Sequence, residues 1–191
     1  LNEIIDIGAV KVRNGVIESE FTELVRPVKS IPEFIANLTG ISDRDVGNAG
    51  AIRDVMPAFL DFVAGYRLVG QNVSFDIDFL RQAAGFGSID GAIDNIELAR
   101  ILLPELPSYS LDSLIDFFAV SPEKRHRALD DARVTAEIFL KLLDMLTVVP
   151  VSFLNEMMTL ASKTDSALVP VFEAQLMARV DETPSAKTGK A

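Results

Sequence analysis

A β-hairpin pattern near the N-terminus constrains the fold of this chain more than any other feature. In EIIDIGAVKVRNGVIESEFTELV (residues 3–25), Ile5, Ile7 and Ala9 alternate with polar or smaller neighbours, as in a half-buried strand. A second run of this kind follows Asn14-Gly15, a dipeptide that tolerates the positive φ angles of a tight hairpin turn. The chain is therefore predicted to open with two antiparallel strands.

The segments after the hairpin show mainly helical periodicity. A short helix is predicted to end at Gly40, and residues 52–63 carry apolar side chains at three- and four-residue spacing. YRLVGQN (66–72) predicts a short strand, and SFDIDFLRQAAG (74–85) predicts the helix that follows it. Together these elements predict an α/β fold in which helices cover a mixed sheet.

Three further helices are predicted in the next part of the chain. Two of them, within residues 96–106 and 110–120, are separated by Pro104 and Pro107. The third and longest covers residues 128–146. Its predicted core face consists of Ala132, Ala136, Phe139, Leu140 and Leu143.

The sequence changes character after Pro150. Two helices broken near Pro170 are predicted there, and the final DETPSAKTGKA is too poor in apolar residues to pack. We therefore predict a domain over residues 1–147, a helical extension or connector over 148–180, and a disordered tail over 181–191.

Composition excludes several classes of protein. The 191 residues include no cysteine, which excludes a disulfide frame and a thiolate zinc site and suits a reducing cytoplasm. No run approaches the roughly 18 apolar residues of a membrane span, so no membrane is expected as a partner. The net charge of −10 argues against a broad basic surface for nucleic acid but is compatible with an acidic pocket that holds cations. Because residue 1 is leucine, we expect that an N-terminal piece is missing.

The only histidine, His126, lies five residues before Asp131 in HRALDDA (126–132). Two side chains five residues apart on one helix point about 140° away from each other. They can share a site only if His126 precedes the helix and Asp131 lies in its first turns. For these two residues alone, a surface histidine in a basic patch beside a carboxylate that compensates the helix dipole is the favoured explanation.

A second acidic position lies in GQNVSFDIDFL (70–80). Asp76 is flanked by two large apolar residues at the start of a predicted helix, so its side chain can point into a pocket. Helix capping, with Asn72 and Ser74 as candidate caps, explains the segment as well as a functional site does. Asp78 has a different helical phase and is expected at the surface.

Five segments together resemble the DnaQ-like 3′–5′ exonucleases, which carry an Asp-Glu-Asp-Asp set with a histidine and include the proofreading subunit of bacterial DNA polymerase III. The segments follow the family in order and spacing, and the resemblance covers residues 1–146. It implies a ribonuclease H-like fold. The five segments are EIIDIGAVKV, LTGIS (38–42), NVSFDIDFL, YSLDSLIDFF and HRALDDARVTAEIF.

The resemblance also implies the roles of individual residues. His126 matches the general base, and Asp76 and Asp131 match ligands of two divalent cations, Mg²⁺ or Mn²⁺. Paired cations can activate a water molecule and stabilise the leaving oxygen of a phosphodiester, and such cations prefer carboxylate ligands. An imidazole can accept the proton of the attacking water near neutral pH. Candidate nucleic-acid contacts, from the resemblance alone, are Thr39, Gly40 and Asn72.

One family motif is missing. The first motif, Asp-x-Glu on the central first strand, should lie about ten residues before EIIDIGAV, and the chain begins only two residues before that segment. Glu3 and Asp6 are predicted to be solvent-facing strand residues that do not replace it. We therefore predict a truncated fragment or a degenerate relative that lacks two of the four acidic ligands and most of the first strand.

The resulting expectation is a metal-dependent exonuclease that removes nucleotides from single-stranded 3′ ends of DNA in proofreading or repair, although the fragment itself could be inactive. A polymerase subunit is one expected partner. A fused DinG-type helicase is another, because residues 148–180 resemble the connector of such fusions. Two alternatives stay open: a non-catalytic module of the same fold that binds nucleic acid or a protein, and an exonuclease directed at RNA, which shares every motif quoted above.

Overall fold

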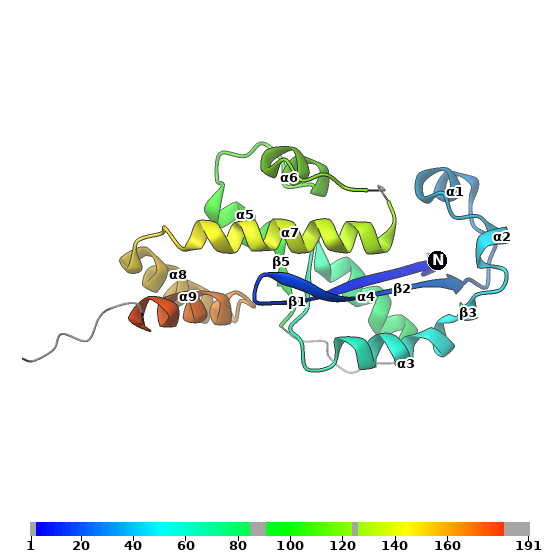
Figure 1. Cartoon of the computed structure of the whole chain (residues 1–191), viewed down its shortest axis with the longest axis horizontal. Helices are drawn as coiled ribbons and strands as arrows, with labels where there is room; N and C mark the ends of the chain where they lie inside the picture. The colour runs from blue at the N-terminus through cyan, green and yellow to red at the C-terminus, as the bar shows by residue number, and fades with distance from the viewer. Residues whose placement is uncertain (1–2, 85–90, 124–125, 182–191) are drawn as a thin grey trace, which may run out of the picture. The chain divides into compact units, whose positions relative to one another are not determined.

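The predicted hairpin is present in the computed structural model, which describes residues 3–84, 91–123 and 126–181 (Figure 1). Strands β1 (Asp6–Arg13) and β2 (Val16–Arg26) pair antiparallel. The turn between them uses Asn14 and Gly15 with φ of 52° and 78°, as the dipeptide predicts. A register shift between Lys11 and Val12 shows that the pairing contains one irregularity.

Hydrogen bonding divides the strands into two small sheets. Strand β3 (Gly50–Ala51) lies parallel to the end of β2, and β4 (Val69–Gly70) lies parallel to β5 (Ile93–Asp94). The predicted mixed α/β fold is confirmed, but the sheet is less continuous than expected. In the described residues, no strand is hydrogen-bonded to the second edge of β1 or of β4, so no strand pairing connects the two sheets.

Helices surround these strands in the first of two compact units, Leu1–Leu142. The predicted helix before Gly40 and the helix at 52–63 are both confirmed, as are the helices on either side of Pro104 and Pro107. The helices of this unit are α1 (Glu33–Thr39), α2 (Asp43–Val46), α3 (Ile52–Val63), α4 (Val73–Ala84), α5 (Asn95–Leu102), α6 (Leu111–Phe118) and most of α7 (Ala128–Leu146).

The hairpin and helices α3 and α4 share one apolar core. Side chains from β1, β2, α3 and α4 are buried together there, which explains the alternating pattern in the strands and the helical spacing at 52–63. The buried members of this core are Ile7, Val25, Val55, Met56, Phe59 and Leu80.

Helix α7 packs directly on the hairpin. A Cβ atom added to Gly8 of β1 would lie 2.1 Å from the amide nitrogen of Leu129 and 2.2 Å from the carbonyl carbon of Ala128. The glycine is therefore required by the close approach of two backbones. Further along α7, the Asn95 side-chain amide donates a 2.9 Å hydrogen bond to the carbonyl of Thr135, which ties the helix to α5.

The predicted core face of α7 was only partly right. Of its five residues, only Ala136 is fully buried, and the others are half-buried. The residues with no exposed surface are Ile138, Leu142 and Leu146, at a regular spacing of four. Elements β1, β2 and α5 all contact α7. Buried residues are therefore not confined to a single apolar stripe along the helix.

The second compact unit covers Leu143–Ala191, so the division falls inside α7, a few residues before the boundary predicted at 147/148. It contains α8 (Val151–Lys163) and α9 (Val169–Asp181), which begins one residue before Pro170, as a proline in a first helical turn allows. Its core includes Leu154 and Phe172. The predicted disordered tail lies almost entirely outside the described residues. In the described part of the chain, no helix has the length and apolar character of a membrane span.

Candidate active site

The structure brings His126 and Asp131 together at the start of α7. His126 lies in the turn before the helix, with an exposed side chain and a φ of 62°, and Asp131 lies in the first turns of α7. The carboxyl group of Asp131 accepts a hydrogen bond from the backbone of His126 and interacts electrostatically with its imidazole. The condition set by the five-residue spacing is thus met, because the histidine precedes the helix.

Asp131 is held in an unfavourable environment for a negative charge. Partial burial raises the pKa of its carboxyl group above the ordinary value, and His126 opposes this shift only in part. The nearby carboxylates of Asp130 and Asp112 raise the pKa further. An acid-rich and partly desolvated position of this kind is typical of functional carboxylates.

Asp76 lies in the first turn of α4, as predicted, with its side chain exposed. Protein atoms around the carboxyl group raise its pKa by desolvation, and the neighbouring carboxylate of Asp94 raises it further. Asn72 and Ser74 are the caps that the sequence suggests for α4, but neither side chain caps this helix in the described structure. Instead, the Asp94 carboxylate accepts hydrogen bonds from the backbone amides of Asn72 (3.0 Å) and Val73 (3.2 Å).

Asp94 is a residue that the sequence reasoning missed. It also caps its own helix, α5, because its carboxylate accepts a 2.9 Å hydrogen bond from the amide of Ile96. One side chain thus joins the end of β5 to the junction between β4 and α4, close to Asp76. An aspartate immediately before a helical segment is the pattern that could have indicated the cap, whereas the contact with residues 72 and 73 has no local pattern.

The prediction that Asp6 faces solvent was wrong. Its side chain is 9% exposed, and its Oδ2 atom accepts hydrogen bonds from Arg127 Nε (3.1 Å) and from the backbone amide of Ala128 (3.1 Å). Asp6 and Gly8 share one face of β1, and α7 packs on that face, so both faces of the strand are covered. Glu3, half-buried, also has a partner, because its carboxylate accepts a hydrogen bond from the amide of Val28.

The described residues offer only part of a site for paired cations. Asp76 and Asp131 supply the hard oxygen ligands that Mg²⁺ and Mn²⁺ prefer. However, residues 3–84, 91–123 and 126–181 contain no group of three or more acidic or histidine side chains placed to hold a metal ion. The contacts join His126 to Asp131, and Asp76 to Asp94, without a described contact between the two pairs. These residues alone therefore do not fit the two-cation cage that the resemblance implies.

Thr39 and Gly40, two of the candidate nucleic-acid contacts, have local structural roles. The Thr39 hydroxyl donates to the carbonyl of Ile35 (2.8 Å) and accepts from the amide of Ile41 (3.2 Å). Gly40 ends α1 in the left-handed conformation, with φ of 70°. These contacts explain both residues without a ligand, so their role in binding stays a prediction.

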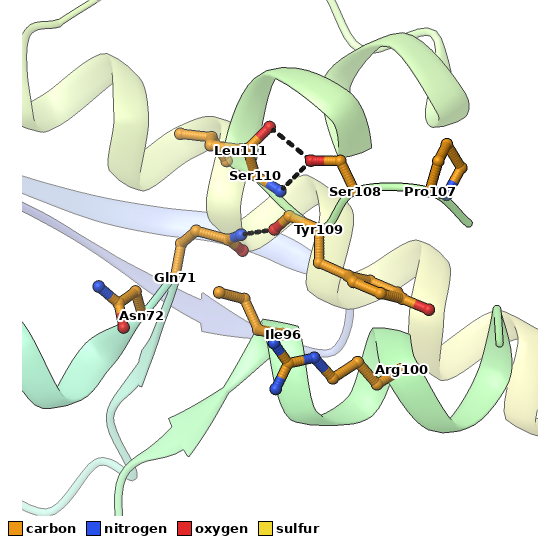
Figure 2. Close-up of a pocket in the computed structure, with 9 residues that line it drawn as sticks. All are labelled: Gln71, Asn72, Ile96, Arg100, Pro107, Ser108, Tyr109, Ser110 and Leu111. Atoms are coloured by element: carbon orange, nitrogen blue, oxygen red, sulfur yellow. Dashed lines mark hydrogen bonds between the residues drawn. The ribbon is translucent and has the colours of Figure 1, made fainter. Parts of the chain in front are cut away.

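The third candidate, Asn72, lines a pocket of about 490 Å³ beside the start of α4 (Figure 2). The amide nitrogen of Gln71 donates a 2.7 Å hydrogen bond to the carbonyl of Tyr109, whereas its Oε1 atom is buried without a hydrogen-bond partner in the described structure. The Arg100 guanidinium lies 5.6 Å from the centre of the Tyr109 ring. The pocket therefore presents a cation and an aromatic ring, next to an acceptor that is buried without a partner in the described structure.

Comparison with known proteins relates these features to nucleases. The RNase_T family model, described as an exonuclease, matches residues 1–139. The chain is 37% identical over 183 residues to a PolC-type DNA polymerase III of Caldanaerobacter subterraneus, a match that covers 93% of the chain and 13% of that protein. It is 39% identical over 149 residues to the DNA polymerase III subunit epsilon of Aquifex aeolicus, which covers 76% of the chain and 74% of the relative. The match to the 3′-5′ exonuclease DinG of Bacillus subtilis is 34% identical and covers 90% of the chain and 19% of that protein.

Solved structures show the same fold. Exonuclease X, solved in complex with 5′ overhanging duplex DNA, superposes with a TM-score of 0.62 at 27% identity, covering 74% of this chain and 82% of that one. The nuclease domain of 3′hExo, a DEDDh family member bound to rAMP, gives a TM-score of 0.66 at 21% identity, covering 74% and 81%. The chain spans only a small part of the long PolC-type relatives, whereas it spans most of these nuclease domains.

Proposed function

Since the chain belongs to the exonuclease family of the RNase_T model, with DnaQ-like relatives, we propose that it forms the nuclease part of a 3′–5′ exonuclease that acts on DNA ends in replication proofreading or repair. The observation that carries the proposal is the pairing of His126 with Asp131 at the start of α7. Both the residue types and their order along the chain follow the family.

In the proposed reaction, His126 acts as the general base. A water molecule attacks the terminal phosphodiester, its proton passes to the imidazole, and the bond between phosphorus and the 3′ oxygen breaks. The exposed position of His126 gives water and a strand end access to the ring. The carboxyl group of Asp131 lies beside the imidazole and interacts with it electrostatically.

Asp76 and Asp131 are the proposed cation ligands of this chain. The family generally uses two divalent cations, and such ions, held in part by these two carboxylates, would supply polarisation of the attacking water and stabilisation of the leaving oxygen. Mg²⁺ and Mn²⁺ are the proposed ions because the available ligands are carboxylates. Two carboxylates do not complete such a site, and the contacts of His126 support its role without reference to the cations.

The proposed substrate is a single-stranded 3′ end of DNA. Asn72 supports a strand contact next to Asp76, because it lines the pocket that also presents Arg100 and Tyr109. Such a pocket offers the cation and the aromatic ring with which proteins bind unpaired nucleotides. The names of the relatives support a DNA polymerase as the proposed partner, or a fusion with another enzyme of DNA metabolism, and the cytoplasm as the place of action.

The test is digestion of a 5′-labelled single-stranded DNA by the full-length protein, with Mg²⁺ or Mn²⁺, followed on a sequencing gel. His126→Ala is expected to lower turnover by roughly 10²–10⁴, the usual contribution of a general base. Asp78→Asn is the control, because Asp78 is exposed on α4 and pairs with Arg81 at 3.4 Å. Turnover unchanged by His126→Ala would remove this residue from the mechanism. Faster digestion of a matching RNA oligonucleotide would indicate the RNA-directed enzyme. Binding of DNA without cleavage would indicate the non-catalytic module.

A further inference from the structure

We propose that Asp6 is a positioning residue for His126. Through its bonds to Arg127 and Ala128, its carboxylate would hold the turn that presents the imidazole beside Asp131. The functional part of this inference rests on the proposed exonuclease activity, whereas the positioning itself does not. Asp6 is 121 residues away from Arg127 in the sequence, so no local pattern connects them.

The contacts of Asp6 are concentrated on one oxygen. Its Oδ2 atom accepts hydrogen bonds from Arg127 Nε and from the Ala128 amide, each at 3.1 Å, and these are the two residues that follow His126. The Ala128 amide lies at the first position of α7, where backbone donors lack partners within the helix. The carboxylate therefore acts as a cap supplied by another element and as an ion-pair partner at once.

Burial makes this contact strong enough to hold a turn. The Asp6 side chain is 9% exposed, and its second oxygen, Oδ1, is buried without a hydrogen-bond partner in the described structure. A buried carboxylate that lost Arg127 would be an uncompensated charge, so the ion pair resists separation. The strand that carries Asp6 is itself fixed by β2 and by the apolar core around Ile7.

The conformation of His126 requires such support. Its φ of 62° lies in the left-handed region, which is unfavourable for residues other than glycine and persists only where the surroundings determine it. The bonds from Asp6 begin at the next residue along the chain. They therefore restrict the backbone that connects His126 to α7. This part of the backbone helps to set the direction of the imidazole relative to the helix.

A second contact between the hairpin and α7 provides a matched control. Glu20 of β2 accepts hydrogen bonds from Arg133 Nε (2.8 Å) and Arg133 NH2 (2.6 Å). This pair joins the same hairpin to the same helix, but Arg133 lies seven residues after His126, and Glu20 is more exposed than Asp6. Glu20→Gln thus removes a strand-to-helix ion pair and leaves Arg133 its ion pairs with Asp130 (2.9 Å) and with Glu123 (3.6 Å), which precedes α7.

The experiment is NMR on the labelled 191-residue chain at one fixed pH without divalent cations. With a single histidine, the imidazole Hε1–Cε1 resonance reports on His126 alone. Asp6→Asn, which is isosteric but uncharged, is expected to move this resonance and to accelerate hydrogen exchange of the Ala128 amide by about tenfold, the change that loss of a charge-assisted bond would give. Asp6→Ala should enlarge both changes, and Glu20→Gln should leave both at the wild-type values.

The outcomes separate the two levels of the inference. An unchanged His126 resonance together with unchanged exchange of the Ala128 amide in folded Asp6→Asn would overturn the proposal. The result for Asp6→Asn is sufficient even if Asp6→Ala does not fold. Equal changes in Glu20→Gln would also overturn it, since they would indicate general loosening of α7. In the full-length exonuclease, Asp6→Asn should lower kcat by about tenfold with KM within about twofold, as expected for a misplaced catalytic group. If the wild type cleaves no DNA, the proposed function fails, and the NMR comparison still judges the positioning.

Discussion

Asp76 and Asp131 are carboxylates that the fold holds in conditions unfavourable for their charge. Desolvation raises the pKa of each, and neighbouring carboxylates raise it further. A carboxyl group whose pKa is higher in the folded than in the unfolded protein lowers stability at any pH where it is ionised in both states. Both residues are therefore expected to reduce the stability of the free protein, as functional groups commonly do.

Asp131→Asn is therefore expected to stabilise the protein in the absence of divalent cations. At pH 7 the substitution removes a partly desolvated charge and keeps an oxygen that can accept the bond from His126, so Tm should rise by about 1–3 °C. The gain should decline as the pH falls from the raised pKa of Asp131 to the ordinary pKa of an aspartate, and it should vanish below that value, because the wild-type side chain is then protonated in both the folded and the unfolded state. Thermal unfolding followed by circular dichroism in EDTA measures this. Asp61→Asn on the exposed side of α3 is the control, and a lower Tm for Asp131→Asn at pH 7 would contradict the argument.

Some residues of the candidate site can be predicted from local sequence patterns, whereas others cannot. His126, Asp131 and Asp76 could be singled out because each is a polar residue beside the start of a helical segment, a local feature. The contacts of Asp6 and Asp94 could not, because their partners lie 121 and about 20 residues away along the chain. Burial of Asp6 follows from the packing of α7 on β1, which strand periodicity alone does not reveal.

At the scale of elements, the contact between β1 and α7 depends on Gly8. No positive φ requires a glycine there, but a Cβ atom would lie within 2.5 Å of three backbone atoms of Ala128 and Leu129. Gly8→Ala is therefore expected to lower the free energy of unfolding by about 2–4 kcal/mol, since neither backbone can move without disturbing the core. Urea unfolding measures the loss. Gly47→Ala, where the nearest atom would be 3.4 Å away, should change stability by less than about 0.5 kcal/mol, and equal effects would contradict the steric explanation.

Asp94 joins three elements, so its removal should be more harmful than the loss of an ordinary cap. Its carboxylate accepts bonds from the amides of Asn72, Val73 and Ile96. The Ser110 hydroxyl accepts a bond from one backbone amide, that of Ser113, and otherwise contacts only the hydroxyls of Ser113 and Ser108 in the described structure. Asp94→Ala is expected to cost about 2–3 kcal/mol of unfolding free energy, and Ser110→Ala about 1 kcal/mol. Urea unfolding of both variants provides the comparison. A cost for Asp94→Ala no greater than that for Ser110→Ala would show that the link to α4 contributes nothing.

Helix and strand positions followed from local patterns more completely than their packing did. The Asn-Gly turn and the apolar spacing at 52–63 have local causes, and both elements are present as predicted. The core face of α7 was misplaced because the helix has neighbours on more than one side. The division into two sheets was missed because strand pairing joins residues distant in sequence, as in Val69 with Ile93.

At the scale of the whole molecule, the family match and the physical division of the chain nearly coincide. The exonuclease family model ends at residue 139, and the first compact unit ends at Leu142. The match to the PolC-type relative covers 93% of the chain and so includes most of the second unit as well. The second unit is therefore a compact unit within a sequence shared with longer relatives, and its stability can be tested separately from the nuclease site.

The second unit is expected to lose its structure without loss of the first when its core is opened. Phe172 has no exposed surface, so Phe172→Ala removes a fully buried ring and should cost about 3–5 kcal/mol within that unit. Hydrogen exchange measured by mass spectrometry should then become faster in α8, α9 and the last turn of α7, while α3 and α4 keep their protection. Phe153→Ala is the control from the same unit, because that ring is 57% exposed and its removal leaves the core filled. Faster exchange throughout α3 and α4 in Phe172→Ala would mean that the chain unfolds as one cooperative body, and the division inside α7 would then have no energetic meaning.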